Sequence, residues 1–160
     1  NIMDWSGRFY KRAMQNAGVK DFALRADDYV VGDVKVAGNA QAISGSKWVH
    51  HSSFLYDFDD DLMSVLLVPE KQPEYRANRN HLDFLQRLRS VMPPQAGSES
   101  PQDDESSGPA RFLDAVEEAI REEFAERGVV VERAQWEDAV AEVEAYPPSR
   151  RVTRWELEER

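Results

Sequence analysis

Lys35 lies in a short β-prone run that leads directly into the small residues of segment 38–40. A compact ammonium group stabilises negative charge that develops on a carbonyl or phosphate oxygen, and does so best where little water is present. Small residues in a strand let a ligand approach the backbone closely, although they also mark tight strand crossings. A lysine on a strand is usually an exposed charge, so the residues around Lys35 decide whether it has a chemical role.

A second group of polar side chains follows at His50, His51, Ser52 and Ser53. Neighbouring residues on a strand point to opposite faces, so two adjacent histidines cannot chelate one ion. No third ligand is evident in the sequence, and we expect no metal site. His51 is expected to hydrogen-bond near a pocket, and Ser53 in the same way.

Asp57, Asp59 and Asp61 imitate the start of a calcium-binding loop. Such a loop needs Gly and Glu at the positions that Leu62 and Val68 occupy here. The acidic run therefore predicts the start of a helix rather than a calcium site.

The elements that would position Lys35 are two short strands. A two-residue loop that starts at Gly32 separates β-prone runs at 29–31 and 34–37, which is typical of a hairpin. Because strand side chains alternate, Lys35 and Ala37 should share one face of the second strand.

A third strand is predicted at residues 48–56, after a polar turn at 43–47. One face of it would carry Trp48, His50, Ser52, Phe54 and Tyr56, and the other face His51, Ser53, Leu55 and Asp57.

These residues together resemble the lipoate-protein ligase and octanoyltransferase family, which is related to the catalytic domain of biotin-protein ligases. The resemblance consists of a Lys-x-x-Gly-x-Ala pattern at 35–40, a His-x-Ser-x-Leu pattern at 51–55, and the segment 72–88. It covers roughly residues 5–88, and the order and spacing of the motifs make it specific. It implies an α+β fold, with a mixed β-sheet and flanking helices.

In that family a ligase joins lipoate to ATP, with Mg²⁺, as an acyl adenylate. It then transfers the acyl group to a lysine of a lipoyl-accepting carrier domain. The resemblance implies that Lys35 is catalytic and contacts both the acyl carbonyl and the phosphate. It also implies that the substrate-binding residues are Gly38, Asn39, Ala40, His51, Ser52 and Ser53.

Two alternatives stay open beside an ATP-dependent lipoate ligase. The octanoyltransferases that this sequence resembles use a cysteine, and the sequence contains none, which favours the ligase. An acyltransferase dependent on an octanoyl-carrier protein would need a cysteine upstream. A non-catalytic homologue or fragment is the second alternative, because the family's glycine-rich motif with paired arginines is not in this sequence. The resemblance is thus to the C-terminal part of the domain, and we expect the site to be incomplete in these residues alone.

The formal charge of −10 is unevenly spread along the chain. Residues 1–92 carry equal numbers of basic and acidic side chains, so the acidic excess belongs to residues 93–160. An acidic surface repels phosphate backbones and anionic lipids, so we expect neither a nucleic-acid partner nor a membrane partner. No apolar run approaches the ~20 residues of a membrane span. We expect a soluble protein of the cytoplasm or an organelle, with no visible targeting segment.

The predicted organisation has three parts. Residues 1–92, with a helix at 4–15, would be the C-terminal part of a ligase-like catalytic domain. Residues 93–109 have the Pro-, Ser- and acid-rich composition of a disordered linker. Residues 110–160 would form an acidic helical segment, with apolar stripes at 112–124 and 135–145 that pack against a core.

Overall fold

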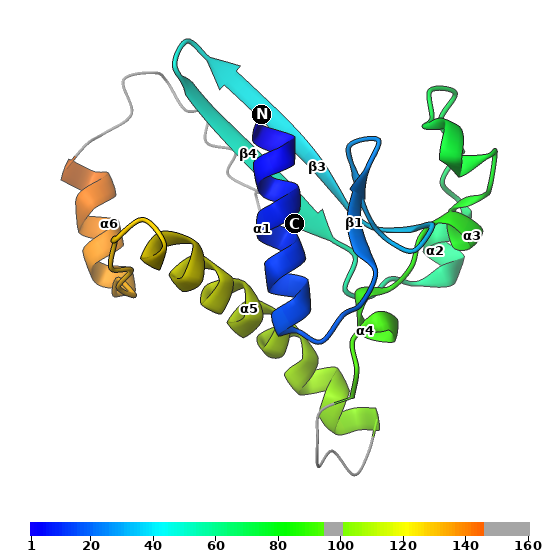
Figure 1. Ribbon diagram of the computed structural model, residues 1–160. Coiled ribbons are helices and arrows are strands. Elements are labelled where there is room, and N and C mark those ends of the chain that lie inside the picture. Colours follow the sequence, from blue (N-terminus) through cyan, green and yellow to red (C-terminus); the bar gives the residue numbers. More distant parts are fainter. Residues whose placement is uncertain (95–100, 146–160) are drawn as a thin grey trace, which may run out of the picture.

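The computed structural model describes residues 1–94 and 101–145 of the 160-residue chain. Its centre is a four-stranded sheet in the order β1-β2-β3-β4 (Figure 1). The strands are β1 (Phe22–Arg25), β2 (Asp28–Val31), β3 (Val34–Ser44) and β4 (Lys47–Phe54). The helices are α1 (Ile2–Asn16), α2 (Asp60–Ser64), the 3₁₀ turn η1 (Glu74–Arg76), α3 (His81–Phe84), α4 (Leu88–Val91), α5 (Pro101–Ala125) and α6 (Trp136–Ala145).

The expected α+β class is confirmed, and β1 to β4 pair antiparallel throughout. In place of the mixed sheet that we expected, the parallel component within the described residues is an isolated bridge between Lys35 and Leu85. Short turns explain the antiparallel pairing, because a parallel pair needs a long crossover between its strands. The hairpin predicted at Gly32 is present, and Gly32 has the positive φ of 62° that such a turn needs.

Helix α1 begins at a capping box. Asn1 Oδ1 accepts from the backbone N–H of Asp4 at 2.9 Å, and the Asp4 carboxylate accepts from the amino group of Asn1 at 3.3 Å. The helix ends before Gly18, whose φ of 79° is left-handed. One face of α1 covers the sheet, with Met14 fully buried.

The core between α1 and the sheet is centred on Tyr29. Its ring stacks between Phe22 and Phe54, with ring centroids 5.9 Å away on each side. Tyr29 and Val36 are fully buried, and the buried Leu88 of α4 packs in the same cluster. This core fixes the first half of β3, where Lys35 lies.

Helix α5 packs against α1 (Figure 1). Ala119 of α5 is fully buried against Phe9 and Ala13 of α1, because small side chains let the two helices approach closely. Arg12 of α1 adds an ion pair to Glu126 at 2.8 Å. The apolar stripe predicted at 112–124 therefore faces the core except at Leu113, which is 64% exposed. The prediction that the stripe at 135–145 packs against a core is wrong for Trp136, which is 77% exposed.

We predicted a disordered linker at 93–109; the structure assigns residues 101–109 to α5. Pro101 suits the first position of a helix, because its fixed φ is already helical. Gly108 is buried, and a Cβ there would collide with the hydroxyl of Tyr56. Tertiary packing thus overrides a composition that is unfavourable for a helix. Residues 95–100 and 146–160 lie outside the described part of the chain.

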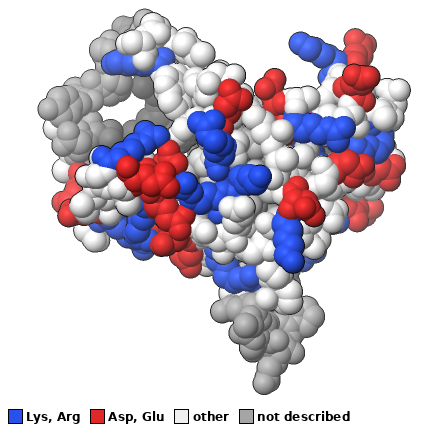
Figure 2. Space-filling view, viewed as in Figure 1, with Lys and Arg blue, Asp and Glu red and all other residues white. Residues whose placement is uncertain are grey.

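Basic and acidic side chains are interspersed on the face of the molecule seen in Figure 2, which shows no broad area of one sign among the described residues. No helix of the described residues is long and apolar enough to cross a membrane.

Candidate functional site

A β-bulge at Val36 sets the direction of the Lys35 side chain. Lys35 pairs with Val30 of β2, but Ala37 pairs with Tyr29, so Val36 is an extra residue in β3. Tyr29 and Val30 are neighbours and point to opposite faces, so Lys35 and Ala37 do as well. The prediction that Lys35 and Ala37 share a face is therefore wrong. Simple alternation fails because a bulge inserts one residue into one strand only.

The bulge brings Lys35 onto the same face as Gly38. A Cβ added to Gly38 would lie 3.5 Å from Lys35 Nζ. Further along the hairpin, Gly38 pairs with Ser53 and Ala40 pairs with His51. Paired residues of an antiparallel ladder point to the same side. Lys35, Gly38, Ala40, His51 and Ser53 thus share one side of the sheet, which we call the Lys35 face.

Asn39 and Ser52 lie on the opposite side, which α1 covers, and they pair with each other. The Ser52 hydroxyl is 3.1 Å from His50 Nε2, and the hydroxyl of Tyr29 is 3.0 Å from the same nitrogen. Burial, and the charge of neighbouring His51, hold the pKa of His50 below its ordinary value. The structure does not bring Asn39 and Ser52 together with Lys35.

An acidic partner holds the Lys35 ammonium. Lys35 Nζ lies 2.6 Å from Asp28 Oδ1, and the two side chains are 25% and 14% exposed. The hydroxyl of Tyr75 donates to the other oxygen, Asp28 Oδ2, at 2.8 Å. Burial, together with the hydrogen bond to Asp28 and its charge, raises the pKa of Tyr75. Both oxygens of Asp28 are therefore engaged.

Neither Asp28 nor Tyr75 was among the site residues predicted from the sequence. Asp28 is two residues before Val30, the pairing partner of Lys35, so it lies diagonally opposite Lys35 on the same face. Because of the bulge, simple alternation of side chains along β3 does not indicate that Asp28 and Lys35 lie on the same face. Tyr75 comes from η1 and is distant in sequence from Asp28, so no local pattern indicates their contact.

The segment that carries Tyr75 is held by two arginines. Arg76 Nε donates to the carbonyl of Arg79 at 3.0 Å, and Arg79 Nε donates to the carbonyl of Arg76 at 3.1 Å. Arg79 Nη2 also reaches the carbonyl of Asp33 at 2.8 Å, which ties the segment to the hairpin turn. Both guanidinium groups lie over the Phe84 ring. Arg76 and Arg79 therefore act as scaffold.

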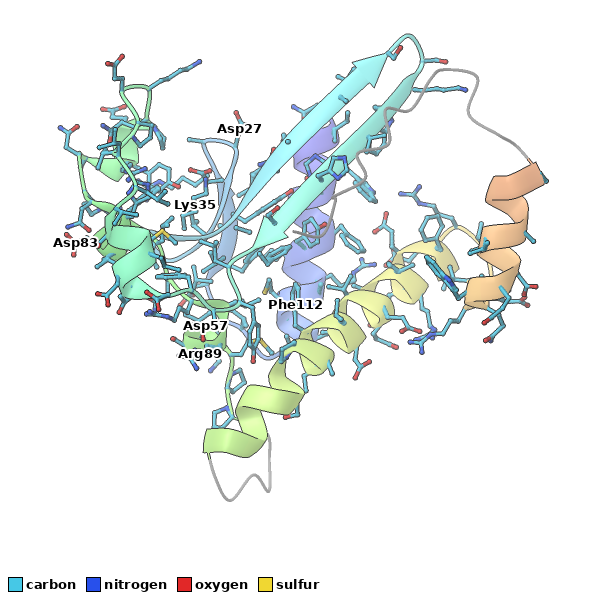
Figure 3. All side chains as sticks on the ribbon, turned by 180° about the vertical axis from the view of Figure 1, so that it is seen from behind. Asp27, Lys35, Asp57, Asp83, Arg89 and Phe112 are labelled. Carbon is cyan, nitrogen blue, oxygen red and sulfur yellow. The ribbon has the colours of Figure 1, made fainter. Side chains whose placement is uncertain are left out.

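A backbone contact completes the attachment to β3. The N–H of Gln86 donates to the carbonyl of Lys35 at 2.8 Å, next to the bridge with Leu85. Figure 3 labels Lys35 at this meeting point of the strands with the segment that follows α2. The backbone of Lys35 is thus held from β2 on one side and from residues 85–86 on another.

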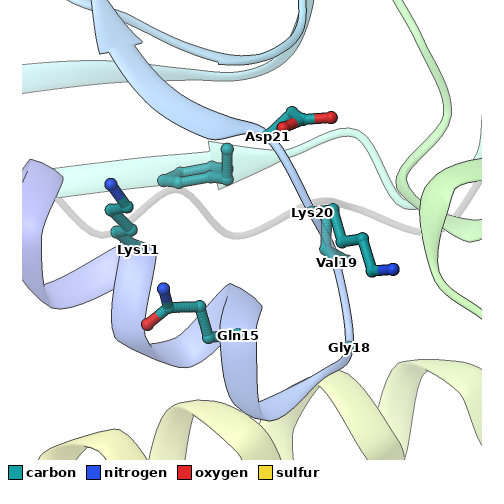
Figure 4. Close-up of a pocket in the computed structure, with 7 residues that line it drawn as sticks. Lys11, Gln15, Gly18, Val19, Lys20 and Asp21 are labelled. Atoms are coloured by element: carbon teal, nitrogen blue, oxygen red, sulfur yellow. The ribbon is translucent and has the colours of Figure 1, made fainter.

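Of two hollows on the surface, one borders the site around Lys35 and the other does not. A hollow of about 470 Å³ is lined by Arg25, Ala26, Glu74 and Tyr75, and it borders the Asp28 contact through Tyr75. The Arg25 guanidinium lies over the Tyr75 ring at 4.4 Å from its centroid. The hollow in Figure 4, of about 490 Å³, lies between the end of α1 and the start of β1 and includes Lys11, Gln15 and Asp21 in its lining. No residue of the Lys35 face lines the second hollow.

The outer part of the Lys35 face is open to solvent, since Ala40, His51 and Ser53 are all exposed. His50 and His51 point to opposite sides of β4, as alternation predicts. Among the described residues there is no group of three or more His, Asp or Glu side chains that could hold a metal ion.

Comparisons with known proteins agree on one family. The family model of the lipoyl protein ligase A/B catalytic domain matches residues 3–100. A Plasmodium falciparum protein (isolate 3D7) called inactive lipoate–protein ligase 2 is 43% identical over 56 residues, which are 34% of this chain. The matched stretch spans 15% of the length of that relative. No solved structure matches the chain.

Proposed function

Because the chain belongs to the lipoyl protein ligase A/B catalytic domain family, we propose that it takes part in attaching lipoate to lysine side chains of acceptor proteins through an acyl adenylate. The observation that carries this proposal is the Lys35 ammonium, oriented by Asp28 beside a glycine that leaves its approach open.

Lys35 serves as the electrostatic catalyst in this proposal. An ammonium has three N–H donors, and Asp28 engages one of them, so two remain for a ligand. Directed at the oxygen of an acyl carbonyl, they stabilise the negative charge that develops there as a nucleophile attacks. The missing side chain at Gly38 leaves room for that oxygen. Ala40, His51 and Ser53 would contact the acyl chain along the same face.

In this proposal, cations near Asp28 would bind the phosphate of a nucleotide. Arg25 lines the hollow beside Tyr75, and Lys35, which does not line it, is joined to Tyr75 through Asp28. Lys35 and Arg25 would hold the phosphate oxygens. Mg²⁺ is usually held by substrate phosphates, waters and one or two carboxylates. We do not assign Asp28 to it, because both Asp28 oxygens are already engaged by Lys35 and Tyr75. ATP, when bound, supplies the activation of the lipoate carboxylate. The acceptor in this proposal is a carrier domain that presents a lysine for lipoylation.

Binding of a non-hydrolysable lipoyl adenylate analogue to the full chain tests the proposal, measured by calorimetry. We expect Lys35→Ala to weaken binding at least about tenfold, since a charge-assisted contact is worth about 1.5–3 kcal/mol. Lys47→Ala is the matched control, because Lys47 lies at the far end of the same hairpin. Equal binding by the parent chain and Lys35→Ala would contradict the assignment.

A non-catalytic role is the second candidate. The observation in its favour is the name of the Plasmodium falciparum relative, which is called inactive. Pyrophosphate release with free lipoate, ATP and Mg²⁺ separates the two candidates. Binding of a carrier domain without pyrophosphate release would favour the second.

A further inference from the structure

We propose that Asp28 and Tyr75 are positioning residues that hold the Lys35 ammonium at one point and leave its other N–H groups directed at the ligand. This inference rests on the proposed role of Lys35. It concerns the position of the ammonium in the free protein, however, so it can be tested without measuring lipoate attachment.

The contacts form a short chain from η1 to β3. Tyr75 donates to one oxygen of Asp28 at 2.8 Å, and the other oxygen lies 2.6 Å from Lys35 Nζ. A hydrogen bond between charged groups at such a distance is among the stronger ones in proteins. With both oxygens engaged, the carboxylate cannot rotate without breaking one of the contacts.

Because the Asp28–Lys35 pair is partly buried, its attraction should be stronger than that of a surface ion pair. Asp28 is 14% exposed and Lys35 is 25% exposed, so solvent screens their attraction less than it screens the pair between Arg79 and Asp33, where Asp33 is 75% exposed. A lysine side chain also has high rotamer entropy, and an unheld ammonium would sample many positions. Fixing it in the free protein removes that cost from ligand binding.

Contacts that do not involve the Lys35 side chain fix the position of Tyr75. Arg76 and Arg79 lock the backbone of η1, and Arg79 ties it to the carbonyl of Asp33 next to β3. The Arg25 guanidinium covers the Tyr75 ring from the β1 side. The position of the Tyr75 hydroxyl is therefore set independently of Lys35, as a positioning residue requires.

Chemical labelling of lysines in the full chain tests this inference. Acetic anhydride at limiting concentration, followed by peptide mass spectrometry, reports the reactivity of each lysine. A lysine amine held by a carboxylate reacts slowly, so Asp28→Asn should raise labelling of Lys35 at least about fivefold, the equivalent of an ion pair of about 1 kcal/mol. Tyr75→Phe should raise it by a smaller factor. Lys11, Lys20, Lys47 and Lys71 in the same sample serve as internal references.

Asp27→Asn is the matched control, because it makes the same chemical change one residue away on an exposed side chain. It should leave Lys35 labelling at the parent level. Melting curves identify a variant that fails to fold; if Asp28→Asn fails, Tyr75→Phe decides the question. Unchanged Lys35 labelling in the folded variants would overturn the inference while leaving the proposed function intact. Weaker binding of the adenylate analogue by Lys35→Ala tests that function separately.

Discussion

The indole N–H of Trp5 donates a hydrogen bond to the carboxylate of Glu123, a residue 118 positions later in the chain, at 3.2 Å. This contact joins α1 to α5, and Arg12 adds ion pairs to Glu122 and Glu123 of α5. The acidic part of the chain is therefore packed on the part that carries Lys35.

Glu123→Gln should make stability less sensitive to acid. Burial acts to raise the pKa of Glu123, but hydrogen bonds from Trp5 and Arg127 and the charges of Arg127 and Arg12 outweigh it, so the pKa lies below its ordinary value. A carboxyl with a lowered folded pKa contributes stability above its unfolded pKa and loses it as pH falls through the folded value. Urea unfolding should show the variant less stable by about 1 kcal/mol at pH 7, with the difference shrinking below about pH 4.

The control for this prediction is Glu118→Gln, whose carboxylate makes only a 3.9 Å surface pair with Arg121. It should leave the pH dependence unchanged. If the free energy of unfolding fell equally with decreasing pH in the parent chain and in Glu123→Gln, this would contradict the argument.

Gly108→Ala should destabilise the protein, contrary to the usual effect of this substitution. In an open helix interior, Ala is more favourable than Gly by about 1 kcal/mol. Here the new methyl group would collide with the Tyr56 ring and hydroxyl, so we expect a loss of about 1–3 kcal/mol from overpacking. Thermal melting measures the effect. A higher melting temperature for Gly108→Ala would show that α5 does not lie against Tyr56.

Gly38→Leu should block the ligand without unfolding the sheet. The Cβ position at residue 38 lies 3.5 Å from Lys35 Nζ, which is ordinary contact, so Gly38→Ala should fold and bind. The branched part of a leucine would extend beyond that point into the space in front of the ammonium. Calorimetry with the adenylate analogue should show a loss of at least about tenfold for Gly38→Leu, as a displaced contact of about 1.5 kcal/mol requires. Equal affinity of the leucine and alanine variants would place the ligand elsewhere.

Lys35 and Asp28 should show energetic coupling in a double-mutant cycle. Combining Lys35→Ala with Asp28→Ala should cost less than the sum of the single changes by about 1 kcal/mol, because either change alone leaves a partly buried charge without its partner. The cycle for Arg79 and Asp33 should give a coupling of only about 0.2 kcal/mol, since Asp33 is largely exposed. Urea unfolding provides the free energies of unfolding. Equal coupling energies in the two cycles would contradict the claim that partial burial strengthens the pair of Lys35 and Asp28.

The sequence was sufficient for the hairpins and for placing Lys35 on a strand. Gly32 marks the first turn, and the alternation along β4 correctly separates His50 from His51. The sequence was insufficient where tertiary contacts determine the local backbone conformation. The bulge at Val36 is stabilised by a fully buried side chain and by the N–H of Leu55, which donates to the Val36 carbonyl at 2.8 Å. Neither contact is local.

The first turns of α5 illustrate the same limit. The composition of residues 101–109 is unfavourable for a helix, and the packing of Gly108 against Tyr56 has no counterpart in local sequence. The contact of Asp28 with Tyr75 likewise depends on how η1 is tied to β3.

The bulge at Val36 also changes what motif spacing means. On a flat strand, two residues on one side are separated by an even number of positions, whereas Lys35 and Gly38 are separated by an odd number. The odd spacing between the lysine and the glycine of the Lys-x-x-Gly motif therefore reflects the bulge in the backbone. Moving the glycine by one position would preserve the composition of the motif, yet it would put the small residue behind the sheet and a side chain in front of the lysine.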